Sequence, residues 1–450
     1  EIAQCLVGSE MCIRDSYSTN HSSPDVTLRD AIVHGLAPDR GLYMPERIPS
    51  IPKAFFRHIG EMSLHEIAYV VANTLFGDDV DSEELRNIVA DTLGFDIPLR
   101  KVDDNRYVLE LFHGPTLAFK DVGARFMAHM LSHFHSKEKS TGDVNVLVAT
   151  SGDTGSAVAN GFLNVPGVRV FVLYPHGKVS PIQEAQFTTL GGNITAIEID
   201  GTFDDCQSLV KSAFIDDELN KAMHLTSANS INVARFLPQM FYYYHAYARM
   251  VQEGVDPEQI VVAVPSGNFG NICSALIAKR MGLPIKRFIA ANNRNDVFLR
   301  YLNTGEYNPG ASIPTIANAM DVGEPSNFAR ILDLYGNDHA AIKADISGCS
   351  YTDDQIRSTM REVYDSTGYI LDPHGATACR ALGEQLLPGE KGIFLETAHP
   401  AKFKDTVEDA IGARVQIPSR LAAFMRGEKS TVRLSRQFPA FKKFLLSQIQ

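Results

Sequence analysis

Short apolar runs alternate with amphipathic, helix-like stretches along most of the chain from Tyr107 onward. Each run has the length of a strand and is bounded by turn-forming residues, which is typical of a strand buried on both faces. The predicted strands cover residues 144–149, 169–174, 194–199, 260–264, 287–291 and 393–396. Strands that alternate with helices in this way predict an α/β fold, with parallel sheets covered by helices. In such folds the ligand site lies at the carboxyl ends of the strands.

The N-terminal part of the chain follows a different pattern. Helical periodicity begins at Asp25 and returns over residues 63–76 and 82–93. We therefore predict a small helical N-terminal lobe over residues 17–105. Residues 1–16 have neither the basic start nor the apolar core of a signal peptide. We interpret them as a non-native leader, with a genuine short extension as the alternative.

The remaining chain divides into two predicted parts. Residues 106–416 are expected to form an α/β catalytic core of two lobes. Within it, residues 321–368 interrupt the alternation of strands and helices, which predicts an insertion. The sequence after Gln416 is polar, and we expect residues 417–450 to form a C-terminal segment that docks onto the core.

One lysine stands at a junction that suits cofactor chemistry. Lys120 closes the turn-prone segment HGPTLAFK, between an apolar run at residues 107–112 and a helix-like stretch at residues 122–134. Partial burial there would disfavour the charged amine and free it to attack an aldehyde. Lys120 is therefore a candidate Schiff-base former. An ordinary surface lysine near a helix start is the alternative.

Two loops have the composition of anion-binding sites. Residues 266–271, SGNFGN, follow a buried strand and open a helix-like stretch, so their N–H groups could hold a phosphate. Residues 150–155, TSGDTG, follow another strand and suit a small carboxylate. A plain tight turn is the alternative for the first loop, and a helix cap formed by Ser151 or Asp153 for the second.

Composition narrows the class of partner. The 450 residues carry a formal net charge of −11, which disfavours nucleic acid and anionic membranes. The sequence has no apolar run long enough to span a bilayer. The six cysteines are scattered, without a metal-ligand spacing, and are typical of reduced thiols in a cytoplasmic protein. We expect a small-molecule substrate, no metal, and a monomer or homodimer.

Together, these segments resemble the threonine synthase family, whose members are pyridoxal 5′-phosphate (PLP) enzymes of fold type II. The resemblance runs from about Tyr17 to the C-terminal end. Other family-like segments are residues 35–45, 229–232, 321–327 and 396–403. Arg40 departs from the family pattern, in which glycine is expected more often at this position. It lies far from the proposed chemistry in the sequence.

The resemblance implies the conversion of O-phospho-L-homoserine and water to L-threonine and phosphate, the last step of threonine biosynthesis. Lys120 is implied to hold PLP and to move the protons. The residues implied to bind the cofactor are Lys120, Gly267, Asn268, Phe269, Gly270, Asn271, Thr397 and Phe119. Thr397 should face the pyridine nitrogen of PLP.

The candidate substrate-binding residues fall into two groups. Those for the carboxylate are Ser151, Asp153 and Thr154, and those for the phosphate are Asn229, Asn232, Arg235 and Ser326. Since Asp153 carries a negative charge, we expect it to order its loop rather than to bind the carboxylate.

Two alternatives remain among PLP enzymes of the same fold. One is a phospho-lyase that releases phosphate without making threonine, and the other is a serine or threonine dehydratase, since a shared fold does not fix the reaction. An alternative of another class is a PLP-binding protein without turnover.

Overall fold

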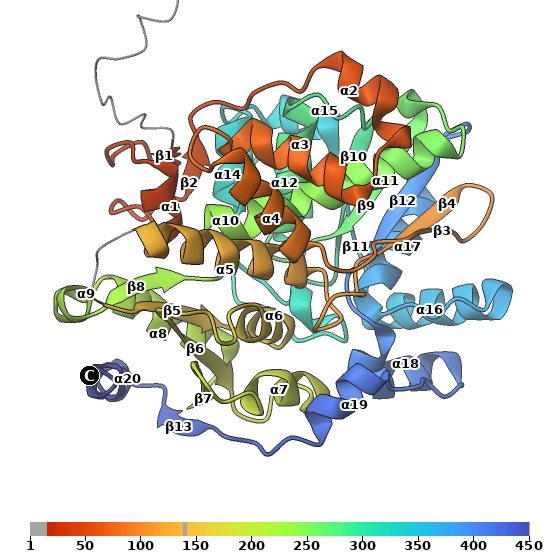
Figure 1. Ribbon diagram of the computed structural model, residues 1–450. Helices are drawn as coiled ribbons and strands as arrows, with labels where there is room; N and C mark the ends of the chain where they lie inside the picture. Colours follow the sequence, from red (N-terminus) through yellow and green to blue (C-terminus); the bar gives the residue numbers. More distant parts are fainter. Residues whose placement is uncertain (1–15, 138–141, 450) are drawn as a thin grey trace, which may run out of the picture.

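The computed structural model describes residues 16–137 and 142–449 (Figure 1). Apart from Ser16, the predicted leader lies outside the described residues. Ser16 begins strand β1 (Ser16–Ser18), which pairs antiparallel with β2 (Tyr43–Pro45). Among the described residues, no helix combines the length and the hydrophobicity needed to cross a membrane.

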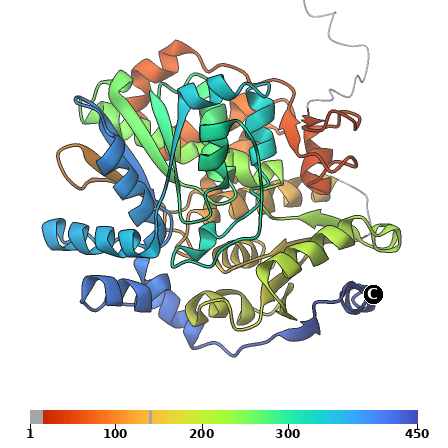
Figure 2. The same ribbon diagram turned by 180° about the vertical axis from the view of Figure 1, so that it is seen from behind.

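Two larger sheets form the frame of the molecule (Figures 1 and 2). The six-stranded sheet has the order β11 (Ile346–Ser350), β10 (Arg287–Asn292), β9 (Ile260–Pro265), β12 (Lys391–Glu396), β4 (Arg106–Glu110) and β3 (Leu99–Lys101). The five-stranded sheet has the order β13 (Val432–Ser435), β7 (Ile194–Asp200), β6 (Val168–Pro175), β5 (Val144–Ala149) and β8 (His224–Ser227). All pairings in these two sheets are parallel except that of β3 with β4. The predicted α/β fold with parallel sheets is confirmed.

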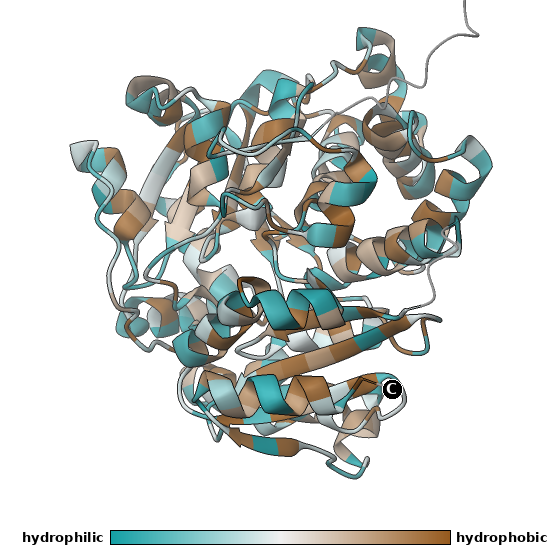
Figure 3. Cartoon of the chain, turned by 90° about the vertical axis from the view of Figure 1, so that its left-hand side faces the viewer, coloured by the Kyte–Doolittle hydropathy of each residue, from teal (hydrophilic) through white to brown (hydrophobic). Residues whose placement is uncertain are grey.

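Helices cover both faces of each sheet. Successive side chains of a strand point to opposite faces, so each strand packs against helices on both sides. Val146 and Val148 of β5 face the helices α5 and α6, whereas Leu147 and Ala149 face α8 and α20. The helices around the five-stranded sheet are α5 (Lys120–Lys137), α6 (Asp153–Gly161), α7 (Pro181–Thr188), α8 (Phe203–Phe214), α9 (Asp217–Ala222) and α20 (Phe438–Ser447). In Figure 3 the strands are mainly brown, as expected for strands covered on both sides.

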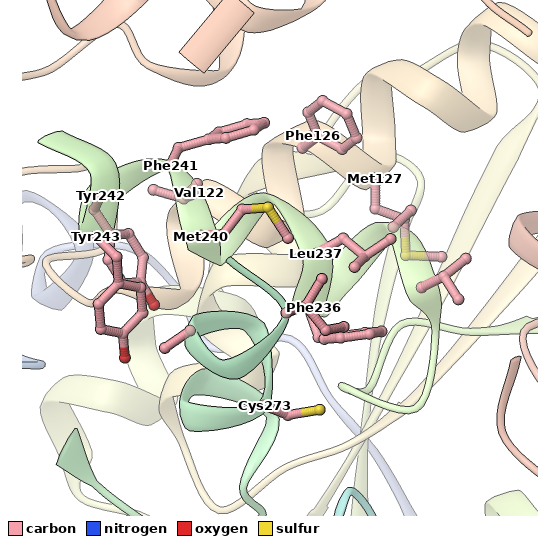
Figure 4. Close-up of a cluster of buried hydrophobic side chains, with 14 of the residues drawn as sticks. Val122, Phe126, Met127, Phe236, Leu237, Met240, Phe241, Tyr242, Tyr243 and Cys273 are labelled. Carbon is pink, nitrogen blue, oxygen red and sulfur yellow. The ribbon is translucent and has the colours of Figure 1, made fainter. Parts of the chain in front are cut away.

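The six-stranded sheet is covered in the same way. Its Val261 and Ala263 face one group of helices, and Ile260 and Val262 face the other. The first group is α16 (Asp353–Thr367), α17 (Pro373–Gln385) and α18 (Lys404–Ile411), and the second includes α11 (Met240–Gln252) and α12 (Gly270–Arg280). Figure 4 shows the apolar cluster between α5 and α11, where the rings of Phe126 and Phe241 pack edge to face at 5.8 Å.

The N-terminal lobe is helical, as predicted. Its helices are α1 (Leu28–His34), α2 (Lys53–His58), α3 (Leu64–Phe76) and α4 (Ser82–Thr92). Polar caps fix their starts: Ser63 and Glu66 form a capping box at α3, and the Asp81 carboxylate accepts from the first N–H groups of α4. The lobe packs on α5 and α11.

The structure differs from the prediction at residues 321–368. This segment contains α14 (Phe328–Leu334), α15 (His339–Asp345) and the edge strand β11, so the alternation continues there. The β11 sequence, ISGCS, is polar and short, which hid it from a search for apolar runs. The other helices are α10 (Val233–Phe236), α13 (Val297–Thr304) and α19 (Ser419–Met425), with 3₁₀ turns at Ile59–Glu61, Leu237–Gln239, Pro257–Gln259, Asn318–Met320 and Pro400–Phe403. In the C-terminal segment, β13 pairs with β7.

Arg330 joins the N-terminal lobe to the core. Its fully buried guanidinium donates to the carbonyls of Tyr43 (3.0 Å), Ser230 (2.9 Å) and Ile231 (2.6 Å). It also lies 4.0 Å above the ring of Phe236. One side chain of α14 therefore holds two segments, around Tyr43 and around Ser230, that are distant from it in the sequence.

Replacing Arg330 with methionine should lower the free energy of unfolding by about 2–3 kcal/mol, because three carbonyls lose a charged donor. Urea unfolding followed by circular dichroism measures this change. Arg426→Met, at an exposed position after α19, is the matched control and should change stability by less than about 0.5 kcal/mol. Equal stability of the two variants would contradict the role of Arg330.

Candidate active site

The carboxyl ends of strands from both sheets open onto one cavity, which we call the central cavity. From the six-stranded sheet, the lining residues are Phe119 and Lys120 after β4, residues 265–271 at the end of β9, and Thr397 after β12. From the five-stranded sheet, they are Ser151 and Thr154 after β5, and Asn229 and Ser230 after β8. Parallel strands bring their carboxyl ends to the same edge of a sheet, so loops that are distant in the sequence meet here.

Lys120 is held in place through its main chain. It is the first residue of α5, and its carbonyl accepts from Arg235 Nη1 at 3.0 Å. The N–H of Phe119 donates to the Thr397 carbonyl at 2.9 Å. Before the helix, the N–H and hydroxyl of Thr116 donate to the Asp121 carboxylate, which closes the turn. The lysine side chain therefore enters the cavity from a rigid helix start.

The Lys120 amine is easier to deprotonate than an ordinary lysine. Although its side chain is partly accessible from the cavity, loss of solvation lowers the pKa of Lys120 to about 8. The Asp153 carboxylate opposes this shift, and the positive charges of Arg235 and Lys402 add to it. With this pKa, about a tenth of the amine is neutral at pH 7, against less than about a thousandth for an ordinary lysine, and the neutral form is the nucleophile.

A buried ion pair lies beside this amine. Lys402 Nζ is 2.5 Å from Asp153 Oδ1 and donates to the Thr116 carbonyl at 2.9 Å. Gln183 donates to the same carboxylate at 2.9 Å. Burial opposes ionisation of Asp153, but Lys402 and Lys120 outweigh it and lower the pKa of Asp153 to about 2. Asp153 is therefore an anion with its own cation.

The loop after β9 presents main-chain donors to the cavity. The N–H groups of residues 267–271 donate to no group among residues 16–137 and 142–449. A β-carbon on Gly267 would lie 2.7 Å from the Met320 Cα, so only glycine fits against that segment. Phe269 adopts the left-handed conformation, with φ of 62°, and directs the chain into α12. Free N–H groups at a helix N-terminus form an anion site.

The Asn271 side chain adds another donor. Its Oδ1 accepts from the hydroxyls of Tyr242 and Tyr243, each at 2.7 Å, and Figure 4 shows these two rings side by side. Its buried Nδ2 has no hydrogen-bond partner among the described residues. A buried donor without a partner is costly, so a bound acceptor would satisfy it. A primary amine, an anion cradle and the free hydroxyl of Thr397 together fit PLP.

The loop after β5 leaves further donors free. The Thr150 hydroxyl accepts from the N–H groups of Gly152 (2.9 Å) and Gly155 (2.8 Å). The N–H groups of Ser151, Asp153 and Thr154 donate to no described residue. These donors begin α6, where the helix dipole favours a negative charge. The loop can therefore hold a carboxylate.

The structure places some of the other substrate-binding candidates in the central cavity and others outside it. Arg235 and Asn229 line the central cavity, but Arg235 Nε donates to the Ala228 carbonyl at 2.7 Å, and the Asn229 amide pairs with the main chain of Ala149. Asn232 caps α10 and donates to the Ile32 carbonyl at 2.8 Å, away from the cavity. The N–H of Ser326 donates to Asn268 Oδ1 at 2.6 Å, and Ser326 lines a neighbouring cavity. Burial lowers the pKa of Arg235 to about 10.

Several lining residues were not predicted as site residues, although Ser230, Asp321 and Val322 lie in family-like segments. They are Phe203, Gln207, Ser230, Gln239, residues 318–322 and His374. The side chain of His374 accepts the Ala319 N–H at its Nε2 (3.1 Å), so Nδ1 carries the proton that it shares with Asp372 (2.6 Å). Asp321 also lines the cavity, and burial raises its pKa to about 6. These residues lie outside the glycine-rich loops, so their residue types alone did not mark them as parts of a binding site.

Comparison with known proteins agrees with this geometry. The family model described as "Pyridoxal-phosphate dependent enzyme" matches residues 98–393 of the chain. A second family model, "Threonine synthase N terminus", matches residues 16–93. A third, "Threonine synthase, C-terminal", matches residues 374–445. The fold and the site are those of a PLP-dependent enzyme.

Relatives of similar length identify the family of PLP-dependent enzymes to which the chain belongs. The chain is 44% identical over 430 residues to threonine synthase of Serratia marcescens, covering 96% of this chain and 98% of the relative. It is 42% identical over 431 residues to threonine synthase of Escherichia coli strain K12, covering 96% and 99%. The chain belongs to the threonine synthase family.

Solved structures show the same likeness. The threonine synthase from Escherichia coli has a TM-score of 0.91 at 42% identity, covering 96% of this chain and 99% of that chain. The PLP-bound threonine synthase from Brucella melitensis has a TM-score of 0.89 at 34% identity, covering 97% and 99%. The predicted fold type and cofactor are confirmed.

The PLP-free protein should take up PLP faster as pH rises, with a midpoint at about 8, because the neutral Lys120 amine is the reactive form. Stopped-flow absorbance of PLP gives the rate at each pH. Uptake that does not vary between about pH 6 and pH 11, a range that brackets both the lowered pKa of about 8 and the ordinary lysine value of 10.5, would contradict the shift, as would a midpoint at the ordinary value.

Two variants should move this midpoint in opposite directions. Asp153→Asn removes the anion that raises the pKa of Lys120, so the midpoint should fall below that of the parent protein. Lys402→Met removes a cation that lowers it, so the midpoint should rise. A shift of both variants in the same direction would exclude Coulombic control by these groups.

Proposed function

We propose that this protein converts O-phospho-L-homoserine and water to L-threonine and phosphate, with the residues of the central cavity in the roles given below. The observation that carries the proposal is the grouping of one deprotonatable amine, Lys120, with two separate sets of free N–H donors at helix starts. A PLP enzyme acting on an amino acid needs a site for each of these groups.

Lys120 is proposed as the group that binds PLP and then transfers protons. PLP, when bound, supplies an electron sink that stabilises negative charge on the substrate carbons. The Lys120 amine would take a proton from the α carbon, move protons at the β and γ carbons, and return one at the end. Its pKa of about 8 suits both directions of transfer near neutral pH.

The remaining cavity residues are proposed to bind and orient. The N–H groups of residues 267–271 would hold the PLP phosphate, and Asn271 Nδ2 would add a donor. Ser151 and Thr154 would hold the substrate carboxylate, while Asp153 orders the loop through Lys402. Thr397 would face the pyridine nitrogen with a neutral hydroxyl, which leaves that nitrogen largely unprotonated. Phe119 would pack beside the ring.

The cellular setting is also proposed. Cys206, Cys273, Cys349 and Cys379 are free and buried, which supports a reducing cytoplasmic location. No cluster of histidine, cysteine or acidic side chains among the described residues could hold a metal ion.

The products formed distinguish the proposed synthase reaction from that of a phospho-lyase. Purified protein saturated with PLP and supplied with O-phospho-L-homoserine should yield threonine and inorganic phosphate in equal amounts, because each turnover releases one of each. Amino-acid chromatography and a phosphate assay on the same sample measure both. Phosphate with ammonia and a keto acid, without threonine, would instead indicate the phospho-lyase.

Lys120→Ala should lower threonine formation by at least about a thousandfold, since the variant loses both the PLP linkage and the proton carrier. Lys137→Ala, at an exposed position on the same helix, is the matched control and should retain full activity. Circular dichroism checks that both variants are folded. Unaltered turnover of Lys120→Ala would overturn the mechanism.

A further inference from the structure

Three consecutive tyrosines on α11 have no role in the mechanism above. Tyr242, Tyr243 and Tyr244 are fully buried, and α11 packs against α12, the helix that begins with the loop of residues 267–271. Phenylalanine would fill the same apolar surroundings without a polar group that needs a partner. The contacts of the three hydroxyls therefore show what tyrosine adds here.

Two of these hydroxyls converge on one atom. Tyr242 and Tyr243 each donate to Asn271 Oδ1 at 2.7 Å, with their ring centroids 5.1 Å apart. In Figure 4 the two rings lie side by side with their hydroxyls at the same end. Neither hydroxyl makes another hydrogen bond with the described residues. Burial raises the pKa of both tyrosines well above the ordinary value, so each hydroxyl keeps the hydrogen that it donates.

This convergence fixes the orientation of the Asn271 amide. An asparagine amide accepts at its oxygen and donates at its nitrogen. If the amide were rotated by half a turn, Nδ2 would face the two tyrosines, and both buried hydroxyl hydrogens would lose their acceptor. Two tyrosines therefore penalise the rotated amide twice, and they direct its donor end away from α11.

That donor end is the group that lacks a partner. Asn271 is only 7% exposed, and its Nδ2 makes no hydrogen bond with residues 16–137 and 142–449. The same residue lines the central cavity, and its main-chain N–H is one of the free donors of residues 267–271. An anion bound by these N–H groups would give Nδ2 the acceptor that the chain itself does not provide.

We propose that Tyr242 and Tyr243 are positioning residues, which hold the Asn271 amide with Nδ2 toward the phosphate of PLP and so set the preference of the protein for PLP over pyridoxal. The inference rests on the proposed function in one respect, that residues 267–271 bind the PLP phosphate. The two tyrosines touch neither the cofactor nor the substrate, and they act through Asn271 alone.

The test titrates the PLP-free protein with PLP and, separately, with pyridoxal, which has no phosphate. Tyr242→Phe and Tyr243→Phe keep the rings, and circular dichroism checks that the variants are folded. Each change should weaken PLP binding about threefold, and the double variant should weaken it about tenfold, because the amide becomes free to turn its oxygen toward the phosphate. Pyridoxal should bind the double variant within about twofold of the parent, since it makes no bond to Nδ2.

Tyr244→Phe is the matched control on the same helix. The hydroxyl of Tyr244 is also buried, but it donates to the Ala278 carbonyl at 3.2 Å. Its loss should leave the ratio of PLP affinity to pyridoxal affinity unchanged. A role of Tyr242 and Tyr243 in packing alone would weaken the binding of both cofactor forms equally, and an unchanged ratio in their double variant would overturn the proposal.

Phosphorus NMR of bound PLP gives a second measurement, which does not depend on pyridoxal. The phosphate resonance should shift in the double variant, because its hydrogen bond to Nδ2 is weakened, and should stay at the parent position in Tyr244→Phe. The same resonance position in the parent and the double variant would also overturn the proposal.

Asn271→Ala tests whether the tyrosines act through the amide. This variant should bind PLP no more tightly than the double tyrosine variant does. Adding Tyr242→Phe and Tyr243→Phe to it should weaken binding no further, because the group that they position is already absent. A further loss as large as that in the parent protein would contradict the proposal.

These titrations contain no substrate, which separates this proposal from the proposed reaction. If the parent protein forms no threonine while the double variant loses its preference for PLP, the reaction fails and the positioning role stands. If the parent forms threonine while the double variant keeps the parent's preference, the reaction stands and the two tyrosines are structural.

Discussion

The charge balance among Lys120, Asp153 and Lys402 is the constraint on which the site depends. An amine that must lose its proton near neutral pH cannot have an anion as its sole partner, because the anion would stabilise the charged form. Lys402 neutralises Asp153 at 2.5 Å, so Asp153 can order the loop after β5 while desolvation still lowers the pKa of Lys120 to about 8. The ion pair also ties the segment after β12 to the start of α6. The same contact therefore sets both the geometry and the proton affinity of the site.

The two-sheet frame explains why one cavity can serve several anions. Each parallel strand is followed by a helix, and the first N–H groups of a helix have no partner within the helix itself. The loops after β5 and β9 come from different sheets, yet both line the same cavity. Their free donors are supplied by the main chain, which needs no cationic side chain in the interior. Buried cations can then be kept for structural bonds, as with Arg330 and Lys402.

Much of the frame was predictable because buried parallel strands leave continuous apolar runs: β5 and β9 lie within one residue of their predicted bounds. β11 was missed because its edge position lets ISGCS remain polar. Lys120 and residues 267–271 were found from motifs that also fix local geometry. Asn232 came from a family-like segment and Arg235 was chosen as a cation just after it, yet their polar groups are used by a helix cap and by carbonyls. Gln207 and His374 gave no signal, because their place in the cavity depends on packing between distant elements.

Burial distinguishes the cations that hold this protein together from those able to bind an exchanging ligand. Arg235, Arg330 and Lys402 are nearly inaccessible, and each already donates to carbonyls or a carboxylate, so a new anion would have to displace those bonds. The side chains of Arg40 and Lys211 are exposed and form no hydrogen bond or ion pair with the described residues, so an anion could bind either of them without displacing one.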